Sequence, residues 1–149
     1  MKILLAIDDS QYSADAVEEV AGRPWPAGSI VRVLSAVDVT PVATDPSFIA
    51  SLDIDTLRNE IARRYEEVMS RAVCLLREKG LSAEMVARDG DPRSVIVDEA
   101  KDWSANLIVV GSHGYTGVKR WLLGSVAHSV VSHAPCSVEV VRKSMAEAA

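Results

Sequence analysis

A glycine-rich segment, GSHGYTGVKRWLLGS at residues 111–125, holds the residues whose spacing best suits ligand chemistry. Its pattern is Gly111-x2-Gly114-x9-Gly124-Ser125, and it directly follows the apolar run LIVV. Residues without a Cβ can turn backbone amides toward a ligand and let it approach closely. Gly124 and Ser125 lie near the start of an expected helix, where free N–H groups and the helix dipole favour an anion. The segment therefore indicates a clamp for a polyphosphate, although the same glycines could serve only tight turns and a helix start.

Several better-known chemical motifs are missing. The sequence contains no G-x-x-x-x-G-K-[ST] phosphate loop, and the dinucleotide pattern G-x-G-x-x-G does not follow its first apolar run. No G-x-S-x-G elbow presents a serine nucleophile. Nor does it carry the arginine, glutamine or paired carboxylates typical of phosphoryl transfer. We therefore expect no catalytic residues.

The metal-binding residue types show no ligand spacing. Cys74 and Cys136 are far apart, and the three histidines have no cysteine or carboxylate partners at a recognised distance along the chain. Free cysteine is among the most frequently buried residues. We expect both cysteines to be small reduced core residues, and no metal ion to be held by the protein itself.

The composition is that of an ordinary globular chain. It has 149 residues, 48% hydrophobic and 25% charged, with a net charge of −5. We expect a single domain over 1–149, with an ordered core at 2–142 and a flexible tail at 143–149. The negative charge argues against bulk capture of nucleic acid or anionic membrane. The apolar run that opens the chain is cut short by Asp8 and Asp9, so we expect a cytoplasmic protein and no signal peptide.

Apolar runs and amphipathic stretches must position the glycine segment, and they alternate along the chain. Strands are predicted at 2–8, 30–37, 82–88, 107–110 and 137–141. Helices are predicted from Ser10 to Gly22, at 53–79, from Asp91 to 103 and at 122–133, with Ser10 and Asp91 as N-caps. The segment 38–51 has two prolines and no clear period, which predicts a long loop, either a lid or a mobile connection. This order predicts a three-layer α/β/α protein with a parallel sheet.

The runs VGSHGYTG, LLGSVAHSVV and HAPCSVEVVR, together with the glycine spacing, closely resemble the ATP-binding branch of the universal stress protein family. The runs ILLAIDDS and DGDPRSVI resemble its first strand and the start of its third helix, so the resemblance covers about 2–142. It implies a Rossmann-like, adenine nucleotide alpha hydrolase-like fold with a five-stranded parallel sheet in the order 3-2-1-4-5. That order places strand one, ending at Asp8, beside strand four, ending at Gly111. Open α/β sheets bind ligands at such a reversal.

The resemblance also implies roles for residues at the ends of the first two strands. Asp8 corresponds to an acidic residue near the nucleotide ribose, and Ala6 and Ile7 lie beside it. Asp8 could instead be a solvated turn residue or help to cap the first helix. Ala36 matches a position whose backbone binds adenine, so its side chain says little.

The family's phosphate-binding positions correspond to Gly111, Gly114, Gly124 and Ser125. His113 is either a phosphate or ribose contact or simply exposed; because imidazole titrates near pH 6.5, such a contact would be sensitive to pH. Thr116 and Gly117 lie in the same loop and match less securely. Lys119 and Arg120 could neutralise phosphate charge or form a solvated pair.

The function implied by the resemblance is an ATP-binding regulatory module of the stress response, with at most slow ATP hydrolysis. Mg²⁺ or Mn²⁺ would accompany the phosphates, which bind divalent cations with few protein ligands. Two alternatives remain open. The chain could be an interaction module that binds no nucleotide, or a weak nucleotide hydrolase.

Assembly is expected at the last strand, 137–141, which lies at an edge in the order 3-2-1-4-5. An unpaired edge is a pairing site, and a two-fold dimer would cover two such edges at once. The resemblance supports the same homodimer. The alternative is that Glu139 and Arg142 keep the edge solvated. The sequence names no further protein partner.

Overall fold

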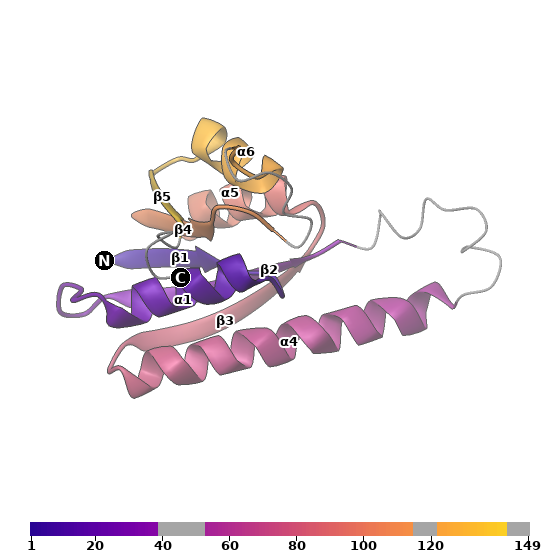
Figure 1. Cartoon of the computed structure of the whole chain (residues 1–149), viewed down its shortest axis with the longest axis horizontal. Coiled ribbons are helices and arrows are strands. Elements are labelled where there is room, and N and C mark those ends of the chain that lie inside the picture. The colour runs from indigo at the N-terminus through magenta and orange to yellow at the C-terminus, as the bar shows by residue number, and fades with distance from the viewer. Residues whose placement is uncertain (39–52, 115–121, 143–149) are drawn as a thin grey trace, which may run out of the picture.

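The computed structural model describes residues 1–38, 53–114 and 122–142. Within these residues five strands alternate with four helices (Figure 1). Their bounds are β1 Lys2–Ala6, α1 Gln11–Gly22, β2 Ile30–Val37, α4 Ile54–Glu78, β3 Ser82–Asp89, α5 Pro92–Asp102, β4 Leu107–Gly111, α6 Ser125–His133 and β5 Ser137–Val141. Apart from Asp38, the expected loop at 38–51 lies outside the described residues, as do the expected tail and the residues 116, 117, 119 and 120. None of the described helices is both long and apolar enough to cross a membrane.

The sheet is parallel throughout and has the order β3-β2-β1-β4-β5, which confirms the predicted fold. Ala6 of β1 lies opposite Leu34 of β2 and Val110 of β4. Figure 1 shows α1 and α4 on one face of the sheet and α5 and α6 on the other. The winding therefore reverses between β1 and β4.

Two apolar clusters form because successive side chains of a strand point to opposite faces. Ile3 and Leu5 of β1 pack with residues of α1 and α4, whereas Leu4 and Ala6 pack with residues of α5 and α6. All four side chains are buried. Since fully burying a leucine or isoleucine contributes about 1.5–3 kcal/mol, β1 is a main source of the fold's stability.

Three helix starts can be compared with their predictions. The Ser10 side chain accepts from the Ser13 N–H, and Asp91 caps α5 ahead of Pro92, as predicted. The helix predicted from residue 122 begins instead at Ser125, after the N-cap Gly124. The reason is tertiary, because the Gly124 N–H donates to the Ser112 carbonyl at 2.8 Å, and Gly124 itself has an extended rather than a helical backbone.

The prediction that both cysteines are core residues is wrong for Cys74, which is exposed on α4. The face of α4 that packs on the sheet carries Met69, Val73 and Leu76 instead. Position 74 therefore points away from the sheet. Cys136 is half-buried, and both thiols are free.

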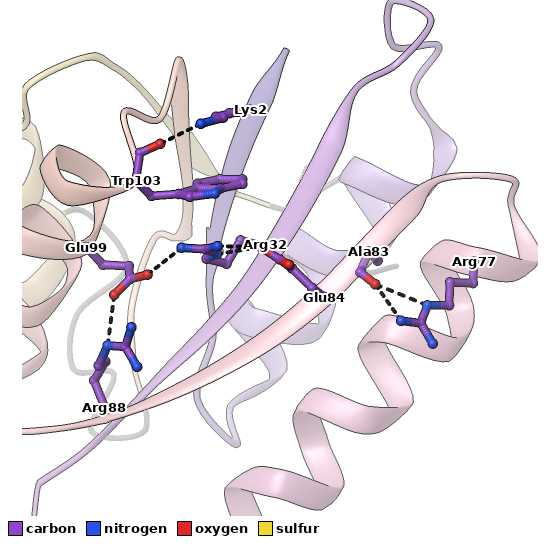
Figure 2. A network of polar contacts seen from close by, with 8 residues as sticks. All are labelled: Lys2, Arg32, Arg77, Ala83, Glu84, Arg88, Glu99 and Trp103. Carbon is purple, nitrogen blue, oxygen red and sulfur yellow. Dashed lines mark hydrogen bonds and ion pairs between the residues drawn. The ribbon is translucent and has the colours of Figure 1, made fainter.

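A polar network fixes α5 to the sheet (Figure 2). Glu99 of α5 is only 6% exposed and accepts from Arg32 Nη1 at 2.8 Å and from Arg88 Nε at 2.9 Å. The Arg32 guanidinium also lies 4.3 Å from the centre of the Trp103 ring and pairs with Glu84. Because Arg32 belongs to β2 and Arg88 to β3, the network holds α5 across two strands. The first turn of α5 is thereby positioned at the carboxyl edge of the sheet.

Candidate functional site

A cavity of about 300 Å³ opens at the carboxyl ends of β1, β2 and β4. It lies where the winding reverses, as the sheet order predicts. Seven of the nine residues predicted for the site line this cavity: Ala6, Ile7, Asp8, Ala36, Gly111, His113 and Gly114. Residues from segments far apart in the chain are thus brought to one place.

The other two predicted residues, Gly124 and Ser125, are not among those that line the cavity, although the next two residues of α6 are. A Cβ on Gly124 would lie 3.0 Å from the His113 Cα and 3.1 Å from the Ser112 carbonyl oxygen. A glycine at 124 therefore lets the start of α6 pack directly on the chain that leaves β4. The two amide-rich elements form one packed unit.

Gly111 and Gly114 are also needed for close packing. A Cβ on Gly111 would lie 2.7 Å from the Tyr12 carbonyl oxygen, a distance that real Cβ atoms do not show. A Cβ on Gly114 would lie 3.0 Å from Asp8 Oδ2. Neither glycine, nor Gly124, has the left-handed backbone that favours glycine in turns. The alternative that these glycines serve tight turns and a helix start holds for Gly124, the N-cap of α6, but each of the three also admits a close neighbour.

Asp8 orders the start of the first helix and also lines the cavity. Its Oδ1 accepts from the Ser10 N–H at 3.0 Å and from the Ser13 hydroxyl at 2.7 Å, so it orders the turn into α1. Its Oδ2 lies beside Gly114, on the cavity. One carboxylate thus joins the end of β1 to the chain that follows β4.

His113 is part-buried, so the alternative of plain exposure is wrong. Its Nδ1 lies 3.1 Å from the Ser112 hydroxyl, and its ring centroid is 5.1 Å from that of Tyr12. Its Nε2 is buried and has no hydrogen-bond partner among the described residues. An unsatisfied buried polar group costs about 1–3 kcal/mol and calls for an explanation, such as a water, an ion or a functional role.

Sequence reasoning missed several residues that line the cavity. Asp38 lies directly after β2 and two residues after Ala36, so continuing the strand period by one residue could have indicated it. Tyr65 comes from α4, and Pro92 and Ile96 come from α5. For these three no sequence signal existed, because their approach depends on how the helices pack on the sheet.

The cavity combines an apolar floor with polar groups. Leu34, Ala6 and Val110 form a row across three neighbouring strands, while Asp8 and His113 lie at the ends of β1 and β4. Such a surface suits a ligand with a flat apolar part and a polar part. No cluster of three or more potential metal ligands occurs among the described residues.

The fold and the cavity place the chain in the class of open, doubly wound α/β proteins whose ligands bind where the strand order reverses. The chain belongs to the universal stress protein family, whose model matches residues 1–142. Universal stress protein YxiE of Bacillus subtilis (strain 168) is 37% identical over 145 residues, which cover 95% of this chain and 98% of the relative. The predicted family is thereby confirmed.

Solved structures share the whole fold, the adenine nucleotide alpha hydrolase-like fold of this family. The hypothetical protein MJ0577 superposes with a TM-score of 0.84 at 26% identity, over 97% of this chain and 96% of the other. The family protein At3g01520 of Arabidopsis thaliana, solved with AMP bound, has a TM-score of 0.72 at 20% identity, over 99% and 94%. A universal stress protein in complex with cAMP has a TM-score of 0.66, also at 20% identity, over 97% and 98%. At 20% identity, the last two similarities show only that the fold is shared.

Proposed function

We propose that this protein binds ATP in the cavity at the carboxyl edge of the sheet and acts as a nucleotide-dependent regulatory module of the stress response. The observation that carries the proposal is that seven of the nine predicted residues line one cavity of about 300 Å³. This volume is at the lower end of the range of small-molecule sites. Two proteins of the same fold, solved with AMP and with cAMP, support an adenine nucleotide as the ligand.

The polarity of the cavity suggests how the nucleotide is oriented. The apolar floor formed by Leu34 and Ala6 suits the base, and the Asp8 carboxylate suits a ribose hydroxyl. The phosphates then face Gly114 and the start of α6, where the helix dipole is positive. His113 lies on the same side, so its ring is close to the expected phosphates.

A divalent cation fits this arrangement for an electrostatic reason. The carboxylates of Asp8 and Asp38 line the same cavity that would receive a triphosphate. These carboxylates would repel the negative phosphates, and Mg²⁺ or Mn²⁺ on the phosphate oxygens would offset the repulsion. We propose that the ion is held through the phosphates, since the described residues offer no ligand cluster of their own.

We also propose a homodimer through β5. Among the described strands β5 pairs only with β4, so its other edge is open. Glu139 at its centre accepts a hydrogen bond from Arg23, the residue that follows α1, at 2.7 Å, so its charge is neutralised within the chain. This favours pairing with a second β5 over a solvated edge. Sedimentation that shows only a 16.0 kDa species at micromolar concentration would contradict the dimer.

The proposal makes ATP a bound regulator in the cytoplasm, with at most slow hydrolysis. The Ser112 hydroxyl lies 3.1 Å from His113 Nδ1, but Ser112 is buried and is not among the residues that line the cavity, so this pair does not present a nucleophile to a bound ligand. Sustained turnover by the purified protein, lost in an Asp8→Ala variant, would instead favour the weak hydrolase. Full regulatory action without any nucleotide would favour the interaction module.

Calorimetry tests the nucleotide site directly. ATP with Mg²⁺ is titrated into the wild-type protein, an Ala36→Phe variant and an Ala87→Phe control. Ala36 lines the cavity, so the phenyl ring should fill it and weaken binding at least about tenfold, or 1.4 kcal/mol. Ala87 is an exposed residue of β3, so its variant should bind like the wild type.

Two outcomes count against the proposal. No heat from the wild-type protein, down to roughly millimolar affinity, would show that ATP is not the ligand. Equal affinities of the wild type and the Ala36→Phe variant would show that ATP binds elsewhere. Mass spectrometry of any nucleotide released on denaturation provides an independent check.

A further inference from the structure

The cavity is bounded by helices from both faces of the sheet. Figure 1 shows α4 and α5 on opposite faces. Yet Tyr65 of α4 and Pro92 and Ile96 of α5 line the same cavity. Beyond the ends of the strands the site is therefore a slot, with α5 on one side and Tyr65 on the other.

Two ion pairs link this part of α4 to the carboxyl edge of the sheet. Arg64, next to Tyr65, pairs with Asp9, in the turn between β1 and α1. Arg58, two turns earlier, pairs with Asp89 at the end of β3 at 2.8 Å. Each pair is largely exposed and contributes little to stability. The place of Tyr65 follows mainly from the packing of α4 on the sheet, where Met69 and Val73 lie in the core.

Tyr65 has the chemistry of a surface for a flat apolar group. Its side chain is half-buried, and burial raises the pKa of its phenol, as do the nearby charges of Asp8, Asp9 and Asp38. The ring therefore stays neutral at physiological pH. His113 is the other aromatic side chain that lines the cavity among the described residues, and it contacts Tyr12 and Ser112 at the polar end. Tyr65 thus offers an aromatic ring on the side of the slot that faces α5.

We propose that Tyr65 forms the aromatic wall on which the base of the bound nucleotide lies, and that this contact makes the site prefer purine over pyrimidine nucleotides. A purine has the larger ring system, so it overlaps an aromatic side chain more fully than a pyrimidine does. The inference rests on the proposed nucleotide site and adds the residue that selects the base.

The test compares two nucleotides that differ only in the base. ATP and CTP, each with Mg²⁺, are titrated into the wild-type protein and the Tyr65→Phe, Tyr65→Ala and Ile61→Ala variants. Loss of one base–aromatic stack weakens binding about 5- to 150-fold. Tyr65→Ala should therefore weaken ATP by at least about fivefold and CTP much less, so that the preference for ATP falls toward one. Tyr65→Phe keeps the ring and should stay within about threefold of the wild type for both nucleotides.

Ile61→Ala is the matched control, because Ile61 lies one turn before Tyr65, is also half-buried and does not line the cavity. It should lower the melting temperature but leave the ratio of ATP to CTP affinity unchanged. If Tyr65→Ala does not fold, Tyr65→Leu keeps most of the packing volume without the ring and serves in its place.

Three results would overturn the inference. Equal losses for ATP and CTP in Tyr65→Ala would indicate a merely structural role, and unchanged ATP binding would exclude the stack. In both cases the wild type still binds ATP, so the proposed function stands. A wild-type protein that binds neither nucleotide would overturn the proposed function and this inference together.

Discussion

Glu99 carries the contact between α5 and the sheet, because its buried carboxylate accepts from arginines of two strands. Removing one partner of a buried ion pair costs about 3–5 kcal/mol when the remaining charge is left without compensation. Here the cost is smaller. Arg32 is 19% exposed and retains Glu84 and the Trp103 ring, and Arg88 is 52% exposed and can turn to water. We expect Glu99→Ala to lower the free energy of unfolding by about 2 kcal/mol.

The two arginines should contribute unequally. Arg32 is the more buried of the two, so its hydrogen bond with Glu99 is less screened by water. In double-mutant cycles we expect a coupling of about 1.5–3 kcal/mol between Glu99 and Arg32. For the half-exposed Arg88 the coupling with Glu99 should stay below about 1 kcal/mol and should weaken further at high salt.

Urea denaturation followed by circular dichroism measures these free energies. Asp98→Ala is the matched control, because Asp98 is an exposed carboxylate on the same helix, and its loss should change stability by less than about 0.5 kcal/mol. A Glu99→Ala variant as stable as this control would refute the reasoning. Equal coupling to both arginines would show that burial does not decide the strength of these pairs.

Three further predictions concern packing and titration. Gly111→Ala should lower the free energy of unfolding, measured by urea denaturation, by about 1–3 kcal/mol, because its methyl group would meet the backbone of α1. Gly22 has open space around it, so Gly22→Ala should be neutral or slightly stabilising. Equal effects of the two substitutions would contradict the close approach at Gly111. Iodoacetamide at pH 8 should label the exposed Cys74 before Cys136, whose thiol pKa is raised by burial; peptide mass spectrometry that finds the reverse order would contradict this. Burial raises the folded-state pKa of Tyr65 above its unfolded value of about 10, so folding favours the protonated phenol, and stability should fall as the pH rises above about 10. Tyr65→Phe should flatten that decline. An equal fall in the free energy of unfolding of both proteins above pH 10 would contradict the prediction.

Much of the fold could be predicted because its elements are marked locally. The caps Ser10 and Asp91 begin their helices where the sequence indicates, and the strand at 137–141 has the predicted bounds. The start of α6 was misplaced because a hydrogen bond between Gly124 and Ser112 sets it, and these two residues are not neighbours in the chain. Exposure of Cys74 was misjudged for a related reason, since residue type alone does not say which side of α4 faces the sheet.

The candidate site divides in the same way. Glycine spacing after an apolar run and an acidic residue after the first strand were enough to select Gly111, Gly114 and Asp8, because these features are written in neighbouring residues. Packing alone decided that Gly111 must admit the backbone of Tyr12. It also decided that Tyr65 of α4 reaches the cavity from the face of the sheet opposite α5. Such contacts join segments that are distant along the chain. They depend on how helices settle on a twisted sheet, a geometry that no local pattern of residues encodes.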